Sequence, residues 1–210
     1  SKNIQTASGV ELSESQRTIV GSVLDLFAGR PSLAKLQLWK DDAEFTDPLT
    51  IAKGRAQYEA QWYGLQTAFS EIERLGHEVK SNGNPIEMDL ETRYVVKGLG
   101  TEKKISSKIQ IWTDGDKIVK VADKSLSHTL TGVLREWIAA RGINRTGEQL
   151  LRPRQPIAVA PAHRAWVFYL WNFTWETTLW RAFRRLNAVT VPNLVSVPKN
   201  AEEDAKRGNQ

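Results

Sequence analysis

The stretch IEMDLETRYVV, residues 86–96, alternates between two kinds of side chain. Its even-numbered positions are mostly apolar, whereas positions 87, 89, 91 and 93 all hold charged residues. Successive side chains of a β-strand point to opposite faces, so a period of two predicts a strand with one buried and one solvated face. The buried face needs a partner layer, and the rest of the chain must supply it.

Turn signals flank this stretch and recur farther along the chain. Asn-Gly at 82–83 precedes it, a Gly-Leu-Gly triplet follows it, and Asp-Gly stands at 114–115. Such pairs favour tight hairpin turns. Alternation returns in residues 105–111 and leads through the second turn into 117–123. The sequence therefore predicts four long strands after Phe69, joined as antiparallel hairpins.

The residues before Phe69 follow helical spacing instead. Ser13 and Gln16 fit a capping box, which satisfies free backbone N–H groups at a helix start. Apolar residues then recur every three or four positions until a Gly-Arg-Pro triplet stops the run. The expected elements, in order, are a helix over 13–27, a short helix around 33–39, a short strand over 41–46 that ends before Pro48, and a helix opened by Gly54.

This order predicts an α+β fold. Each helix has one apolar stripe and the sheet has one apolar face, so a strongly bent antiparallel sheet wrapped around three N-terminal helices buries them all. The expected shape is a cone-shaped barrel with a ligand-sized pocket where the stripes meet. Residues 1–11 are expected to be a flexible N-terminus and residues 12–124 to form the domain.

Two motifs carry a resemblance to a known group of proteins. WKDDAEFTDP, residues 39–48, is followed by Gly54-Arg55 and an aromatic helix, and IQIWTDGDKI, residues 109–118, leads to VADK at 121–124. These stretches resemble the nuclear-transport-factor-2-like superfamily, in its SnoaL-like and ketosteroid-isomerase-like branch, in a fungal-type member. The resemblance implies the cone-shaped fold. It does not imply one activity, because the group contains isomerases, cyclases, dehydratases, epoxide hydrolases, transport factors and binding modules.

Asp47 is the candidate catalytic residue. By resemblance it occupies the position of the general base of ketosteroid isomerases, which is assisted by a Tyr and a protonated Asp. The position of the assisting Tyr falls near Ser22, and that of the Asp falls at Lys108. Both departures argue against isomerase chemistry of that kind. The alternative is a turn carboxylate that accepts backbone N–H groups ahead of Pro48.

Aromatic side chains predominate among the residues expected near the cavity. A buried tyrosine hydroxyl must find a partner, so Tyr94 is expected to orient a ligand. The stripe on the third helix is interpreted either as a ligand shelf or as core. His77 and the acids at 87, 89 and 91 are expected to face solvent. The candidate pocket residues are Tyr58, Trp62, Tyr63, Tyr94, Ile109 and Trp112.

The second half of the chain departs from this pattern. Residues 125–179 are interpreted as an atypical insertion or extension, and residues 180–210 as a C-terminal segment with a polar tail. The Trp-rich stretch 165–180 is too short to span a bilayer, which needs about 20 apolar residues. It could pack on the cone, rest at a membrane interface or cap a dimer. A translated intron is a further hypothesis for 125–179.

Composition limits the classes of function. The 210 residues include no cysteine, which excludes disulfides and thiol catalysis, and the three histidines are too far apart for a zinc site. The net charge of +5 comes from arginines in the second half, for which a solvated basic face is a simpler explanation than nucleic acid binding. No secretory signal pattern is recognised, so an intracellular, cytoplasmic protein is expected.

These observations predict a domain that binds a small apolar or polycyclic molecule. If it is an enzyme, acid–base chemistry of the isomerase, cyclase or lyase type is expected, with Asp47 as base and Tyr94 or Tyr63 as polar partner. Neither a metal nor an organic cofactor is expected, and no nucleic acid partner. The alternative is an interaction module that forms a homodimer, or docks a partner, through the open face of the sheet.

Overall fold

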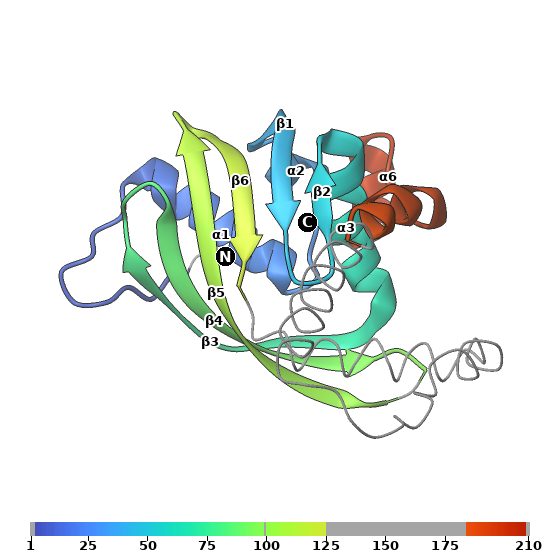
Figure 1. Cartoon of the computed structure of the whole chain (residues 1–210), viewed down its shortest axis with the longest axis horizontal. Coiled ribbons are helices and arrows are strands. Elements are labelled where there is room, and N and C mark those ends of the chain that lie inside the picture. Colours follow the sequence, from blue (N-terminus) through green and yellow to red (C-terminus); the bar gives the residue numbers. More distant parts are fainter. Residues whose placement is uncertain (1–2, 99, 125–183, 209–210) are drawn as a thin grey trace, which may run out of the picture.

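A computed structural model describes residues 3–98, 100–124 and 184–208. The predictions for 125–179 and for the Trp-rich stretch 165–180 lie outside the described residues. Figure 1 shows the order of the elements. They are α1 (Glu14–Phe27), α2 (Leu33–Leu36), β1 (Trp39–Thr46), β2 (Ile51–Lys53), α3 (Arg55–Ala68), β3 (Phe69–Ser81), β4 (Ile86–Val96), β5 (Glu102–Asp114), β6 (Lys117–Asp123) and α6 (Ala201–Lys206).

The helices begin where the sequence predicts. At the start of α1, the backbone N–H of Gln16 donates to Ser13 Oγ at 3.2 Å, and the backbone N–H of Ser13 donates to Gln16 Oε1 at 3.0 Å. The predicted capping box is therefore confirmed. Gly54 precedes α3 with φ of 85°, a conformation that favours glycine. The α+β class is confirmed by this order of elements.

The sheet differs from the expectation in two respects. Its strand order is β2-β1-β6-β5-β4-β3, and β3 to β6 form the predicted antiparallel meander. However, β1 and β6 run in the same direction and pair in parallel, so the sheet is mixed. It is also open, with β2 and β3 as its edges. The predicted α+β fold with a bent sheet is confirmed, but the sheet does not close into a barrel and contains one parallel strand pair. The three-residue β2 was not predicted.

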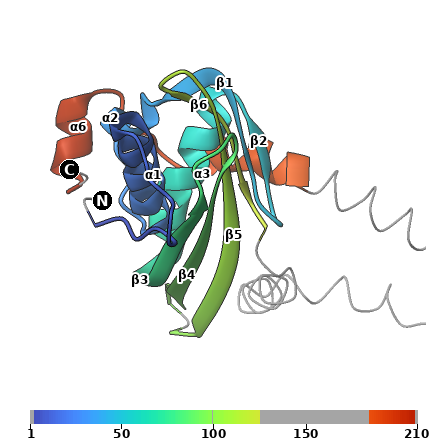
Figure 2. The ribbon, with the colours of Figure 1, turned by 90° about the vertical axis from the view of Figure 1, so that its left-hand side faces the viewer.

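The sheet is bent and its helices share one side. Pairing of β3 with β4 shifts register in three places, one of them between Arg74 and Gly76, and such bulges bend and twist a strand. Figure 2 shows α1 and α3 on the same side of the sheet. The core lies between these layers. It is built around the buried rings of Phe27, Trp39, Phe45, Tyr58 and Trp62.

The C-terminal residues return to the domain. Residues 184–194 are helical and α6 follows them, and Figure 1 shows both beside α3. The Asp204 side chain of α6 is 4% exposed, and its two oxygens accept from the Tyr63 hydroxyl at 2.8 Å and the Leu33 backbone N–H at 2.7 Å. The segment interpreted as a polar tail thus includes a helix with a buried carboxylate.

Candidate functional site

Asp47 lies in the turn that joins β1 to β2. Its Oδ1 accepts the backbone N–H of Leu49 at 2.7 Å, and its own N–H donates to the Thr50 carbonyl at 3.0 Å. Pro48 between them has a fixed φ and no N–H to donate. Asp47 is therefore a turn carboxylate, as the simpler interpretation expected, and this geometry also fixes the direction of its side chain.

A second carboxylate, that of Asp123, stands at the same edge of the sheet. Thr46 pairs with Ala122 in the parallel register of β1 and β6, so the next residues along the two strands are Asp47 and Asp123. Parallel strands end at a common edge. Two acidic side chains from distant parts of the sequence are thereby brought next to each other.

The surroundings alter the acidity of Asp47. Burial and the charge of Asp123 raise its pKa from 3.8 to about 7, against the opposing effects of the N–H groups of Leu49 and Thr50 and the charge of Arg184. Desolvation and a like charge both disfavour the ionised form of a carboxyl group. At neutral pH the group is therefore present in both protonation states, which suits a general acid or base.

Tyr94 interacts electrostatically with both carboxylates. It lies on the buried face of β4 with its ring 4.9 Å from that of Phe69. Burial, with the charges of Asp123 and Asp47, raises the pKa of the Tyr94 phenol far above its usual value, while a hydrogen bond with Thr92 acts in the opposite direction. The hydroxyl consequently stays protonated and can donate a hydrogen bond.

A hollow of about 560 Å³ opens beside the carboxylate pair. Asp47 and Asp123 contribute its acidic groups, and the Trp112 ring from the outer face of β5 adds an aromatic surface. Lys120 Nζ lies 5.5 Å from the centroid of that ring and 2.8 Å from Glu44 Oε1. Thr46, Asp47, Pro48, Gln110, Trp112, Lys120, Ala122, Asp123, Lys124 and Arg184 line the hollow.

The other predicted pocket residues lie in the core. Tyr58 stacks on Trp39 with ring centroids 5.0 Å apart, and Trp62 contacts Phe27 and Phe45. The Tyr63 hydroxyl is engaged by Asp204, and Ile109 is fully buried in the core cluster. Tyr58, Trp62, Tyr63 and Ile109 do not line the hollow beside Asp47, whereas Trp112 does. The structure therefore brings together Asp47 and Trp112, with Tyr94 within electrostatic range.

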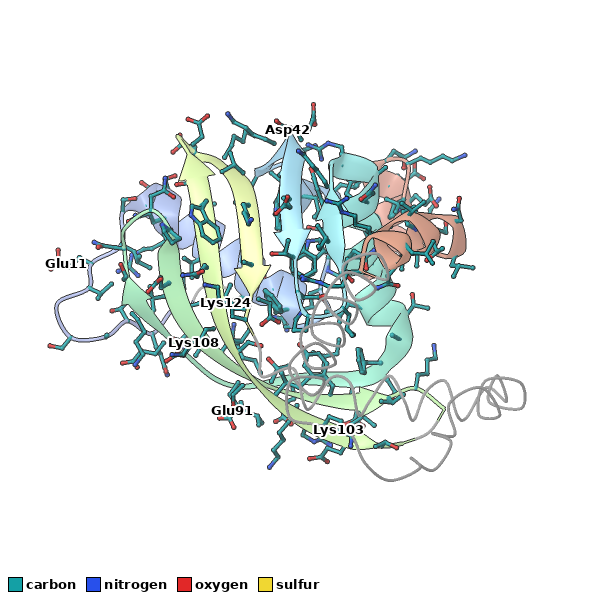
Figure 3. All side chains as sticks on the ribbon, viewed as in Figure 1. Glu11, Asp42, Glu91, Lys103, Lys108 and Lys124 are labelled. Atoms are coloured by element: carbon teal, nitrogen blue, oxygen red, sulfur yellow. The ribbon has the colours of Figure 1, made fainter. Side chains whose placement is uncertain are left out.

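The predicted solvent-facing groups have specific partners. His77 Nε2 accepts the backbone N–H of Gln5 at 3.1 Å, and burial lowers the pKa of its imidazole. Glu87 Oε1 accepts from Gln110 Nε2 across the outer face at 2.6 Å. Asp89 and Glu91 line a second hollow of about 630 Å³ at the bend of the sheet. Lys108 and Lys124, which Figure 3 labels close together, complete its basic side.

Within residues 3–98, 100–124 and 184–208, no cluster of three or more His, Asp or Glu side chains could hold a metal ion. None of the described helices is long and apolar enough to cross a membrane.

Sequence reasoning missed Asp123 and Arg184 as members of the site. Asp123 is the last residue of β6, and Asp47 directly follows β1. Once these two strands are known to run parallel, this placement predicts that the two acids lie together. Arg184 is 137 residues from Asp47, and no local pattern connects them.

Comparison with protein-family models and with curated proteins found no match. Solved structures do match. One is a protein with a ketosteroid-isomerase-like fold from Catenulispora acidiphila, solved with trimethylamine, which is 18% identical over 58% of this chain and 92% of that chain, with a TM-score of 0.46. Another is an NTF2-like protein from Burkholderia xenovorans, 16% identical over 55% of this chain and 94% of that chain, with a TM-score of 0.47.

Several of the matching structures are described as NTF2-like or ketosteroid-isomerase-like. A further example is a protein described as a SnoaL-like polyketide cyclase from Shewanella putrefaciens, 12% identical over 60% of this chain and 88% of that chain, with a TM-score of 0.49. The descriptions of these structures name the same group as the resemblance in the sequence. At these identities the likeness concerns the fold, and it transfers neither ligand nor activity to this chain. Nothing in it bears on a fungal origin.

Proposed function

We propose that this chain binds a small apolar or polycyclic molecule beside Asp47 and transfers a proton on it. The observation that carries the proposal is the placement of Asp47 and Asp123 side by side, with the Asp47 pKa raised to about 7. A base is most effective when its pKa lies near the working pH. The chemistry would be that of an isomerase, cyclase or lyase that needs no cofactor.

The proposed reaction begins with proton abstraction next to a carbonyl group. Ionised Asp47 takes the proton from carbon, the electron pair moves to the carbonyl oxygen, and the proton is returned at another atom of the same molecule. The growing negative charge on oxygen needs a donor. Tyr94 does not line the hollow, but it interacts electrostatically with Asp47 and its hydroxyl stays protonated. It is therefore the better candidate for this donor, whereas the Tyr63 hydroxyl is committed to Asp204.

The arrangement differs from the ketosteroid isomerase pattern. Where that pattern has a tyrosine on the first helix, Ser22 is buried and donates to the Ile19 carbonyl at 2.8 Å. Where it has a protonated aspartate, Lys108 lies exposed on the outer face of β5. The proposed donor therefore comes from β4 instead, and steroid isomerisation in particular is not proposed.

A direct test is hydrogen–deuterium exchange at the α-carbons of a panel of cyclic and polycyclic ketones in D₂O. The wild type should accelerate exchange for at least one ketone, and Asp47→Asn, which keeps the shape and removes the base, should abolish that acceleration. Asp42→Asn removes an exposed carboxylate of β1 and serves as the matched control. Equal exchange with wild type and D47N would remove Asp47 from the mechanism.

The alternative of an interaction module makes a different prediction. The outer face carries ion pairs such as Arg93 with Glu71, Glu73 and Glu102, at 3.2, 3.1 and 2.9 Å. A homodimer through this face would depend on charge, so it should weaken as salt is raised. Native mass spectrometry of the purified protein distinguishes the two readings, because it reports a co-purifying small molecule and the mass of the assembly together.

A further inference from the structure

The turn that carries Asp47 is held by side chains from the C-terminal helix, residues 184–194. Arg184 Nη2 donates to the backbone carbonyl of Asp47 and, at 3.1 Å, to that of Thr50. Asn187 Nδ2 donates to the Leu49 carbonyl at 3.3 Å and to Thr50 Oγ1 at 2.9 Å. Two side chains one helical turn apart thus bind three carbonyls of a single four-residue turn.

The hydrogen bonds from Arg184 and Asn187 all go to residues of this turn. A hairpin turn at a sheet edge normally leaves its outward carbonyls to water. Here a guanidinium and an amide replace that water, and Thr50 is 2% exposed as a result of the packing around it. The same segment packs on α3, where Val191 of the helix and Val195 just after it lie 3.5 and 3.4 Å from the position that a Cβ of Gly64 would take. The helix therefore has a fixed place from which to hold the turn.

Arg184 also brings a charge to the site. It lines the same hollow as Asp47 and Asp123. Its positive charge opposes the effect of burial and of Asp123 on the Asp47 carboxyl, and so lowers the pKa of that carboxyl. Among the described residues, the other charged or titratable groups near Asp47 are Asp123 at the end of β6 and Tyr94 on β4, with the lysines at 120 and 124 on the wall of the hollow.

We propose that Arg184 is a positioning residue of the site, which fixes the turn carrying Asp47 and keeps a positive charge beside its carboxyl group. The site would then be assembled from two parts of the chain, the sheet edge formed by residues 46–50 and 122–124 and the C-terminal helix. This inference rests on the proposed role of Asp47 as a base. It adds that the segment after residue 183 contributes to the chemistry of the site.

The test compares Arg184→Gln with Arg185→Gln. Both variants remove one positive charge from the same helix, but Arg185 is exposed and does not line the hollow. The carboxyl carbon of Asp47 is followed by NMR as pH is varied, with no ligand present. In R184Q the Asp47 pKa should rise above that of the wild type, so that less than half of the carboxyl is ionised at neutral pH. In R185Q it should stay at the wild-type value.

A second measurement separates the charge from the hydrogen bonds. Arg184→Lys keeps the charge but cannot span two carbonyls as the guanidinium does. In R184K the pKa of Asp47 should stay close to the wild-type value. Amide exchange at Leu49 and Thr50 should become about tenfold faster, as expected when roughly one hydrogen bond is lost. R184Q should show both changes, and R185Q neither.

The outcomes distinguish this inference from the proposed function. Equal pKa shifts in R184Q and R185Q, or unchanged amide exchange in both Arg184 variants, would overturn the positioning role. A wild-type Asp47 that titrates in the ordinary acid range would overturn its role as a base near neutral pH. In that case the amide-exchange comparison still decides whether Arg184 holds the turn.

Discussion

Replacing Asp47 by asparagine should stabilise the protein at neutral and higher pH. Asparagine resembles the protonated carboxyl group in shape, and its carbonyl oxygen can still accept the Leu49 N–H. The variant removes only the need to ionise a carboxyl group in a place that disfavours its charge.

The magnitude follows from the pKa difference between the folded and unfolded chain. An ordinary aspartate has a pKa of 3.8 and Asp47 one of about 7. At about 1.4 kcal/mol per pH unit, the difference corresponds to about 4 kcal/mol. Between pH 3.8 and about 7 the folded state binds more protons than the unfolded state. The stability contributed by protonated Asp47 is therefore fully present below pH 3.8 and is lost as pH rises toward 7. The D47N variant has no carboxyl group to ionise at this position, so its stability does not fall in this way.

Urea denaturation at pH 5 and pH 8 measures the effect. The free energy of unfolding of D47N minus that of the wild type should grow by roughly 3 kcal/mol between the two conditions, because about two pH units of the titration lie between them. Asp42→Asn, at an exposed position of β1, should show no such growth. A D47N advantage that is the same at both pH values, or a D47N variant that loses stability at pH 8, would refute the reasoning.

Three other substitutions test the packing by urea denaturation. Gly29→Ala should cost about 1 kcal/mol or more, because Gly29 has φ of 69° and an added Cβ would lie 2.6 Å from Ile72 Cδ1; an unchanged midpoint would contradict the packing there. Trp62→Ala should cost about 3–5 kcal/mol as a core truncation, and a loss below about 1 kcal/mol would favour a pocket wall over core. Asp204→Ala leaves the Tyr63 hydroxyl and the Leu33 N–H without their acceptor and should cost about 1–3 kcal/mol of stability for each. Tyr63→Phe affects only the first of these hydrogen bonds, so it should cost only part of that loss.

Local patterns were sufficient to predict the individual elements. The alternation in β4 and the capping box of α1 are statements about neighbouring residues, and both match the structure. The parallel pairing of β1 with β6 joins residues such as Phe45 and Val121, which are far apart in sequence. Such pairing depends on the path of the whole chain, which strand periodicity does not encode. The parallel pair, and with it the mixed and open sheet, was not predicted for that reason.

The site was harder to predict than the fold. Asp47 was identified by resemblance, but its neighbour Asp123 depends on the parallel register and Arg184 on a contact across 137 residues. The aromatic stripe of α3 was ambiguous for another reason. Helical spacing predicts which side chains face inward, and the same spacing describes a packed core and a pocket wall. Tyr58 and Trp62 prove to be packed against other aromatic rings.

The central claim is that two carboxylates share the edge of β1 and β6 and that one of them is protonated near neutral pH. The most direct test is the NMR titration of the Asp47 carboxyl carbon in the wild type and in Asp123→Asn, with D47N to assign the signal. The wild-type midpoint should lie near pH 7, and loss of the Asp123 charge should lower it. A wild-type midpoint near the ordinary value of 3.8, or one that D123N leaves unchanged, would contradict the account.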